Sequence, residues 1–92
     1  MIHVNLVSFV LRSKTRKRIL ELLLGEQLTP SQIKKRTEMY ESHVSRALKE
    51  LLEKSLIKCE NPEERRFKFY KITSLGKNVL NEANKISKEI GS

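Results

Sequence analysis

The sequence predicts one small, mainly α-helical domain with a two-stranded β-hairpin, and two patterns support this fold class. Apolar residues recur at intervals of three and four along most of the 92 residues, as on the buried face of a helix. Between residues 56 and 72 apolar and charged residues alternate instead, as in half-buried strands. A chain of this length suits a single domain. We therefore expect one domain over 1–92, with its core over about 9–73.

The N-terminal part is expected to form two helices. The apolar spacing favours a first helix that begins near Asn5, although the alternation of apolar residues over 2–6 would also suit a strand. The stretch 12–18 then carries five basic residues and no acidic one. It leads into a second helix, which Gly25 is expected to end in a left-handed turn.

Two further helices form the centre of the predicted domain. A sharp helix start lies at Thr29-Pro30-Ser31-Gln32, which combines a capping threonine, a proline in the first turn and a glutamine that can reach back. A short helix over about 30–36 is followed, after a tight break, by a longer helix over about 41–54. This arrangement is a helix-turn-helix unit. The buried stripe expected on the longer helix is Val44, Ala47, Leu48, Leu51 and Leu52.

The hairpin and a last helix complete the chain. Strands are predicted at 56–60 and 67–72, on either side of a polar tip over 61–66. A hairpin directly after a helix-turn-helix unit is a wing. Thr73 can cap the last helix, which should run to about residue 90. The apolar residues along one side of it resemble a short coiled-coil seam, Leu75, Val79, Ala83, Ile86 and Ile90.

The charge of the chain points to a polyanionic partner. The chain has 19 Lys and Arg residues against 11 acidic ones, all glutamate, so its net charge is +8. Such a balance attracts nucleic acids or anionic surfaces. No apolar run approaches the roughly 20 residues of a membrane span, so we expect no membrane partner. The single cysteine, Cys59, cannot form an internal disulfide, which favours a cytoplasmic location.

Catalysis and metal binding find no support in the residue types. The chain has no aspartate, no glycine-rich phosphate loop and no paired nucleophile and base, so we expect no enzyme and no cofactor. One cysteine and two histidines without ligand spacing do not make a four-ligand zinc site within one chain. We therefore expect no metal.

Four segments in this order resemble the ArsR/MarR-type winged helix-turn-helix transcriptional regulators, particularly the small archaeal ones. They are residues 11–23, 28–33, 43–51 and 70–77, and the resemblance covers about Phe9 to Leu80. It implies a sequence-specific regulator that binds double-stranded DNA, with the helix over 41–54 in the major groove and the wing over 61–66 near the minor groove.

Two departures from the family's usual pattern concern the ends of the longer helix. Glu38 and Ser55 stand where the family usually has glycine, and Tyr40 stands where a small capping residue is common. These departures leave the turn geometry open but not the fold.

The candidate DNA-binding residues follow from the amphipathic pattern and from the resemblance. If the aliphatic stripe of the longer helix is buried, its polar side must face outward, and Arg46 is the best candidate for a bidentate contact to guanine. The free N–H groups after Thr29 suit a phosphate, although plain capping explains the same residues. Lys14 and Arg16 could reach flanking phosphates. Tyr40 either packs over the turn or lies against DNA. The expected set is Thr29, Ser31, Gln32, Lys34, Lys35, Tyr40, Ser42, His43, Ser45, Arg46, Lys49, Arg65, Arg66 and Lys68.

The two ends of the chain are expected to mediate a homodimer, because two-fold operators are read by two-fold dimers. The segment 1–12 and the helix over 73–90 supply the apolar faces. The alternative is that both segments fold back on the chain's own core. The expected interface residues are Leu6, Val7, Val10, Val79, Ala83, Ile86 and Ile90. Any small-molecule effector is unknown.

Two other functions remain open on the sequence alone. Winged helices can act as protein-interaction modules, and Glu38 and Glu41 at the start of the longer helix weaken an approach to phosphate. A non-specific binder of DNA or RNA would have the same charge without reading bases.

Overall fold

The computed structural model of this chain describes the backbone of residues 3–91 and the side chains of residues 3–86. Within these bounds the fold class is confirmed as mainly α with a two-stranded wing, and the first segment is a helix, as preferred. The elements in order are α1 (Val4–Leu11), α2 (Lys14–Leu23), α3 (Pro30–Thr37), α4 (Glu41–Glu53), β1 (Ile57–Cys59), β2 (Tyr70–Ile72) and α5 (Ser74–Gly91).

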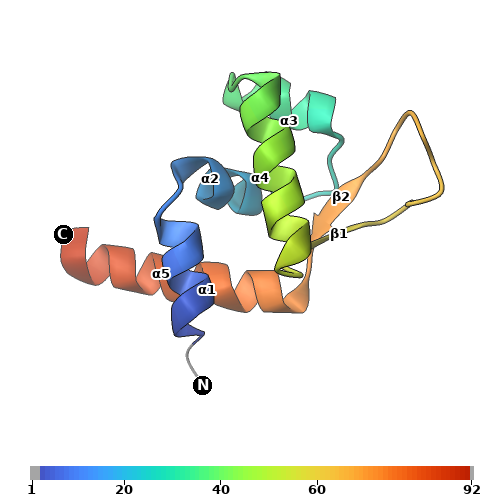
Figure 1. The fold of residues 1–92 in the computed structure, drawn as a ribbon. Helices are drawn as coiled ribbons and strands as arrows, with labels where there is room; N and C mark the ends of the chain where they lie inside the picture. Colours follow the sequence, from blue (N-terminus) through green and yellow to red (C-terminus); the bar gives the residue numbers. More distant parts are fainter. Residues whose placement is uncertain (1–2, 92) are drawn as a thin grey trace.

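The helices pack around one small core. Figure 1 shows α1 crossing α5 at the base of the molecule, α4 rising from this base and α3 beside the far end of α4. Helix α2 packs against α1, α4 and α5, so it lies at the centre. Its residues Ile19 and Leu20 are fully buried. None of the described helices is long and apolar enough to cross a membrane.

The wing is anchored to the body at its base and projects away from it (Figure 1). Strands β1 and β2 pair antiparallel, with Ile57 opposite Ile72 and Cys59 opposite Tyr70. Tyr70 also exchanges two backbone hydrogen bonds with Leu28, at N···O distances of 2.9 and 3.1 Å. This bridge ties the wing to the loop that precedes α3.

Both strands are shorter than predicted because a side chain replaces part of the ladder. Beyond Cys59 the amide Nδ2 of Asn61 donates to the carbonyl oxygen of Phe67 at 2.7 Å. The Oδ1 atom of Asn61 accepts from the backbone N–H of Phe69, also at 2.7 Å. Asn61 therefore holds the arms of the wing together just beyond the last backbone hydrogen bond between them, from the N–H of Glu60 to the carbonyl of Phe69 at 2.7 Å.

The predicted capping residues of α3 and α5 are confirmed. Thr29 and Gln32 form a reciprocal capping box at the start of α3. At the start of α5 the hydroxyl of Thr73 accepts from the backbone N–H of Gly76 at 3.0 Å and donates to the carbonyl of Ser55 at 2.7 Å. Thr73 therefore also fixes the chain segment that leaves α4.

Two expectations about local structure are wrong. Helix α2 ends at Leu23 and leaves through a right-handed cap at Leu24, and no glycine within 3–91 has a positive φ. Gly25 therefore forms no left-handed turn. Leu52 is 36% exposed, because α4 packs against α2, α3 and β1 while Leu52 lies about 100° around the helix from the buried Leu51.

Candidate nucleic-acid interface

Helix α4 separates its side chains into an apolar face and a polar face, as its sequence pattern predicts. Val44, Ala47, Leu48 and Leu51 are all less than 5% exposed. The residues expected to face outward are all exposed, namely Ser42, His43, Ser45, Arg46 and Lys49. Among the described residues none of these five side chains has a hydrogen-bond or ion-pair partner within the chain. The polar face of α4 is therefore available to a ligand.

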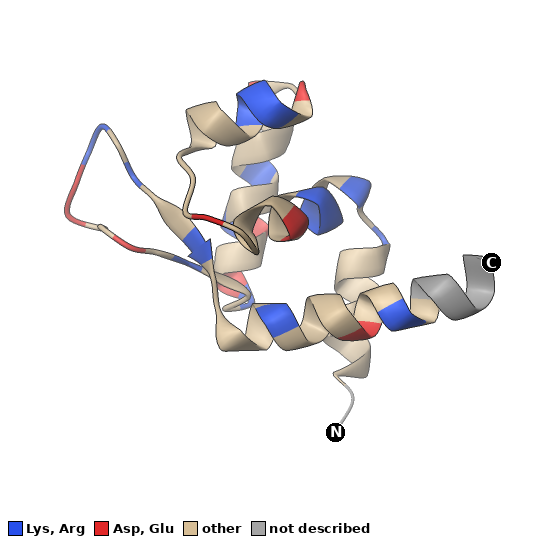
Figure 2. Ribbon diagram, turned by 180° about the vertical axis from the view of Figure 1, so that it is seen from behind, with Lys and Arg blue, Asp and Glu red and all other residues tan. Residues whose placement is uncertain are grey.

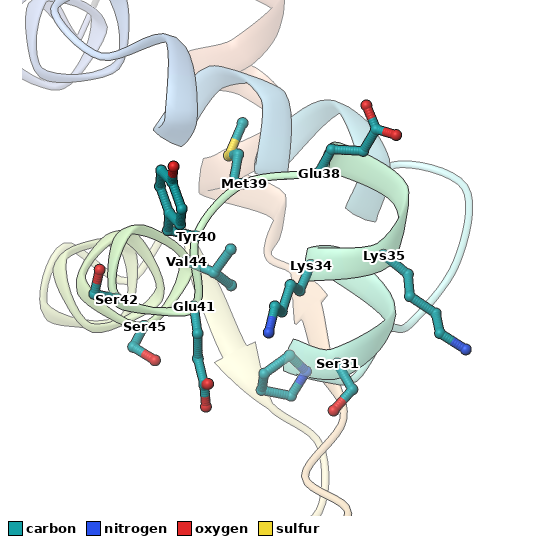
Figure 3. Close-up of a pocket in the computed structure, with 11 residues that line it drawn as sticks. Ser31, Lys34, Lys35, Glu38, Met39, Tyr40, Glu41, Ser42, Val44 and Ser45 are labelled. Carbon is teal, nitrogen blue, oxygen red and sulfur yellow. The ribbon is translucent and has the colours of Figure 1, made fainter.

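An open groove of about 890 Å³ lies between α3 and α4. Figure 3 shows Lys34 of α3 pointing into this groove and Lys35 pointing outward, and Ser42 and Ser45 of α4 also line it. Glu41 also lines the groove, so the groove carries both basic and acidic side chains.

The residues at the start of α3 are divided between capping and ligand contact. The hydroxyl of Thr29 and the amide oxygen of Gln32 are engaged in the capping box, so capping accounts for both side chains. Ser31, Lys34 and Lys35 are exposed. The structure thus brings these three together with the polar face of α4.

The turn between α3 and α4 exposes an aromatic side chain. Glu38 adopts a left-handed conformation with φ 58° and thereby reverses the chain. Met39 packs partly against the core, whereas Tyr40 is 76% exposed. Tyr40 therefore does not pack over the turn. Its ring meets the imidazole of His43 edge-to-face, with centroids 5.7 Å apart.

The wing presents basic and aromatic side chains at its tip. Arg65 and Arg66 are exposed and Lys68 is half-buried. Figure 2 shows acidic residues on the same hairpin, and these include Glu63 and Glu64. Phe67 is 66% exposed, and the sequence analysis missed it as a surface residue. Its place in an alternating pattern assigned it to a strand, but its position next to two arginines could have suggested a wing-tip residue.

Arg16 is not available to phosphate, contrary to expectation. Its guanidinium forms a two-point ion pair with Glu50 of α4, with distances of 3.3 Å from Nε to Oε1 and 2.9 Å from Nη2 to Oε2. Its third nitrogen, Nη1, donates to the carbonyl of Phe9 at 2.7 Å. The hydrogen bond from Arg16, and more weakly its charge, lower the pKa of Glu50. Arg16 is therefore a bridge between α1, α2 and α4.

A second ion pair joins α3 to the preceding loop. Arg36 contacts both carboxylate oxygens of Glu26, at 3.1 and 2.9 Å, and this hydrogen bonding lowers the pKa of Glu26. Both side chains are well exposed, so the pair contributes little to stability.

The expected dimer residues are mostly core residues. Val7, Val10, Val79 and Ala83 are at most 3% exposed and are covered by the chain's own helices. Their assignment to an interface is therefore corrected in favour of the alternative, in which both ends fold back on the core. Leu6 and Ile86 are half-buried against it. Ile90 lies outside the residues whose side chains are described.

Comparison with known proteins identifies the winged-helix architecture. TcaR, an HTH-type transcriptional regulator of Staphylococcus aureus strain Newman, is 35% identical over 75 residues, which are 78% of this chain and 50% of TcaR. The transcriptional regulator BldR of Sulfolobus solfataricus superposes with a TM-score of 0.75 at 25% identity, over 85% of this chain and 57% of BldR. Lactococcus lactis ZitR, solved in complex with DNA, gives a TM-score of 0.68 at 26% identity, over 82% of this chain and 52% of ZitR.

These similarities support the MarR side of the expected resemblance, since a MarR family regulator is also among the solved structures that the chain resembles. They do not establish an ArsR subtype. The chain spans about half the length of the curated relatives that it matches. A family model described as the HVO_A0261 N-terminal domain matches residues 4–92, nearly all of the sequence. The chain therefore belongs to the HVO_A0261 N-terminal domain family.

Proposed function

We propose that this chain is the DNA-binding part of a transcriptional regulator that reads double-stranded DNA by sequence. One observation carries the proposal: the polar face of α4 is exposed and free of partners within the described chain, while its opposite face is buried. A helix of this kind fits the major groove, where each base pair presents a distinct pattern of donors and acceptors. The names of TcaR and BldR and the DNA complex of ZitR support the same function.

Each part of the interface has its own role in this proposal. Arg46 contacts guanine, because a guanidinium can donate to two acceptors on one base edge. Lys34 and Lys35, with the backbone N–H of Ser31 that the capping box leaves unused, hold backbone phosphates. Arg65 and Arg66 lie near the minor groove, where the negative potential is deepest.

Selection of bound duplexes from a random pool tests the proposal. A preferred sequence is expected, and its affinity should fall steeply with salt concentration because Lys and Arg release counterions from phosphates. The same affinity for the selected and for random duplexes would mean that bases are not read. Competition with structured RNA would then identify a non-specific nucleic-acid binder.

A protein-interaction module is the second candidate, and the groove between α3 and α4 favours it. Glu38 and Glu41 both line this groove, where they repel phosphate. Titration of a labelled duplex at low salt separates the two functions. A docking module would not bind the duplex even when electrostatic attraction is strongest.

A homodimer remains part of the proposal, with revised contact residues. Val4 is 67% and Leu11 39% exposed, and both line an apolar groove that α1 forms with Ile86 of α5. A second copy of the chain would cover this surface. Sedimentation of the wild type and of Val4→Glu tests it, and the variant is expected to sediment as a monomer. A cytoplasmic location and an archaeal origin stay predictions.

A further inference from the structure

The Arg16 bridge lies beside the polar face of α4, in a cleft that it shares with His43 and Arg46. The Arg16 side chain is only 17% exposed, and its guanidinium carbon lies 3.8 Å from the centroid of the Phe9 ring. Together with the hydrogen bond to the Phe9 carbonyl, this stacking fixes the guanidinium in one orientation. A planar fork held in this way can engage both oxygens of one carboxylate, and it does so with Glu50.

Glu50 is also the nearest acidic residue along the helix to Arg46. The two are four positions apart on α4, a spacing at which side chains on a helix meet. Both line the same small cleft, together with Arg16 and His43. Among the described residues Glu50 is paired with Arg16 and not with Arg46. Arg16 and Arg46 thus both lie beside the carboxylate of Glu50, and Arg16 forms the ion pair with it.

We propose that Arg16 is a positioning residue for DNA reading, because by occupying both carboxylate oxygens of Glu50 it leaves the guanidinium of Arg46 free to contact a base. This inference rests on the proposed function. Without Arg16, the partly exposed carboxylate of Glu50 has a cation four positions away on either side, Arg46 in the cleft and Lys54 at the end of α4. After the larger effect of the Arg16 hydrogen bond, the charge of Arg46 already lowers the pKa of Glu50. An Arg46–Glu50 pair along α4 would then compete with the contact to guanine.

The central experiment measures affinity for the duplex selected by the wild type and for the same duplex with the Arg46-read base pair replaced. Arg16→Ala is expected to lower the affinity for the selected duplex by roughly five- to tenfold and to reduce the preference between the two duplexes, since a base contact of this kind discriminates by about tenfold or more. Arg16→Ala/Glu50→Gln should restore most of both quantities. Because neutralising Glu50 also relieves the cost of leaving its carboxylate unpaired, the thermal transitions of both variants are measured, and the Arg46→Ala background separates positioning from stability.

The other ion pair supplies a matched control. Arg16→Ala/Glu26→Gln has the same net charge as Arg16→Ala/Glu50→Gln, and Glu26 is likewise held by two contacts to one arginine. It is not expected to restore base preference. In an Arg46→Ala background, Arg16→Ala should cause no further loss of base preference, because the contact that it protects is already absent.

Three results would overturn the inference: equal rescue by the Glu26 and Glu50 substitutions, no rescue by either, or an undiminished effect of Arg16→Ala in the Arg46→Ala background. If Arg16→Ala does not fold, as shown by its thermal transition, Arg16→Lys replaces it in the same cycle, since lysine cannot hold both oxygens in a fork. Failure of the proposed function is distinguishable, because the wild type itself would then select no duplex.

Discussion

Glu38, which caps the end of α3, and Ser55, which follows the C-cap of α4, share a left-handed backbone conformation, with φ angles of 58° and 59°. The resemblance to winged helix-turn-helix regulators implies glycine at both positions. A side chain in this conformation costs roughly 1–2 kcal/mol, because Cβ approaches the following carbonyl oxygen. The chain therefore makes both of these sharp turns with residues that do not favour them.

Glycine at either position is expected to stabilise the protein. Relief of strain outweighs the entropy that glycine loses on folding, which is about 0.5–1 kcal/mol, so Glu38→Gly and Ser55→Gly should each raise the free energy of unfolding by up to about 1 kcal/mol. Chemical denaturation measures this. Glu38→Gln, which removes the charge but keeps the side chain, should give no such gain. A Glu38→Gly variant no more stable than Glu38→Gln would contradict the strain argument.

Gly76 has a different reason to be glycine. A Cβ atom there would collide with the backbone carbonyl oxygen of Leu56 and lie 2.7 Å from Cγ1 of Ile72. Because backbone atoms cannot move aside easily, Gly76→Ala is expected to destabilise the fold by about 1–3 kcal/mol. Gly25→Ala is the matched control, since nothing lies within 4 Å of a Cβ at Gly25. Equal thermal stability of the two variants would show that α5 can shift away from Leu56 and Ile72.

The sequence predicted the helices and the wing because each depends on local periodicity and on caps such as Thr29 and Thr73. It also predicted which polar residues of α4 face outward, since a buried stripe determines the opposite face, but it placed the exposed Leu52 in that stripe. It could not predict that Arg16 is held in an ion pair, because the partners of that side chain come from α1 and α4. Charge content marks a residue as basic, but only tertiary packing decides whether the charge is already paired.

The dependence on tertiary packing also explains why most of the residues expected at a dimer interface are core residues instead. An apolar seam on α5 must be buried, but the pattern does not say against what. Val79 and Ala83 are covered by the chain's own core. Asn61 was likewise assigned only to a polar hairpin tip. Its two hydrogen bonds reach Phe67 and Phe69, six and eight residues further along the chain, and a local pattern does not reveal such contacts.

The stability of the fold should depend on pH through Glu50. The hydrogen bond from Arg16, with a smaller contribution from its charge, holds the pKa of Glu50 below its ordinary value of 4.5. The stabilisation is therefore complete above the pKa of the unfolded chain and is lost as the pH falls through the lower value of the folded state. The difference in unfolding free energy between the wild type and Glu50→Gln should shrink below about pH 4. A difference as large at pH 3 as at pH 7 would mean that ionisation of Glu50 does not stabilise the fold.

The Asn61 side chain should stabilise the paired conformation of the two arms of the wing. Removing its side chain in Asn61→Ala breaks the hydrogen bonds to the Phe67 carbonyl and the Phe69 N–H, each 2.7 Å long. The cost in stability is expected to be about 1–2 kcal/mol, and the Phe69 amide should exchange with solvent faster. Asn78→Ala, on the exposed side of α5, is the control and should leave this exchange unchanged. Unchanged exchange in Asn61→Ala would show that backbone pairing alone holds the wing.

Two substitutions on the proposed interface should separate base reading from phosphate binding. Arg46→Ala is expected to lower the affinity for the selected duplex by about 1–3 kcal/mol and to relax the preference at one base pair, because it removes a bidentate contact. Lys35→Ala should weaken binding to selected and random duplexes alike and reduce the slope of log affinity against log salt by about one, since one phosphate contact is lost. Lys77→Ala removes an equal charge from an exposed position on α5 and should change neither quantity. If Arg46→Ala weakens selected and random duplexes equally, Arg46 contacts phosphate, and the base-reading role passes to other residues of the polar face of α4.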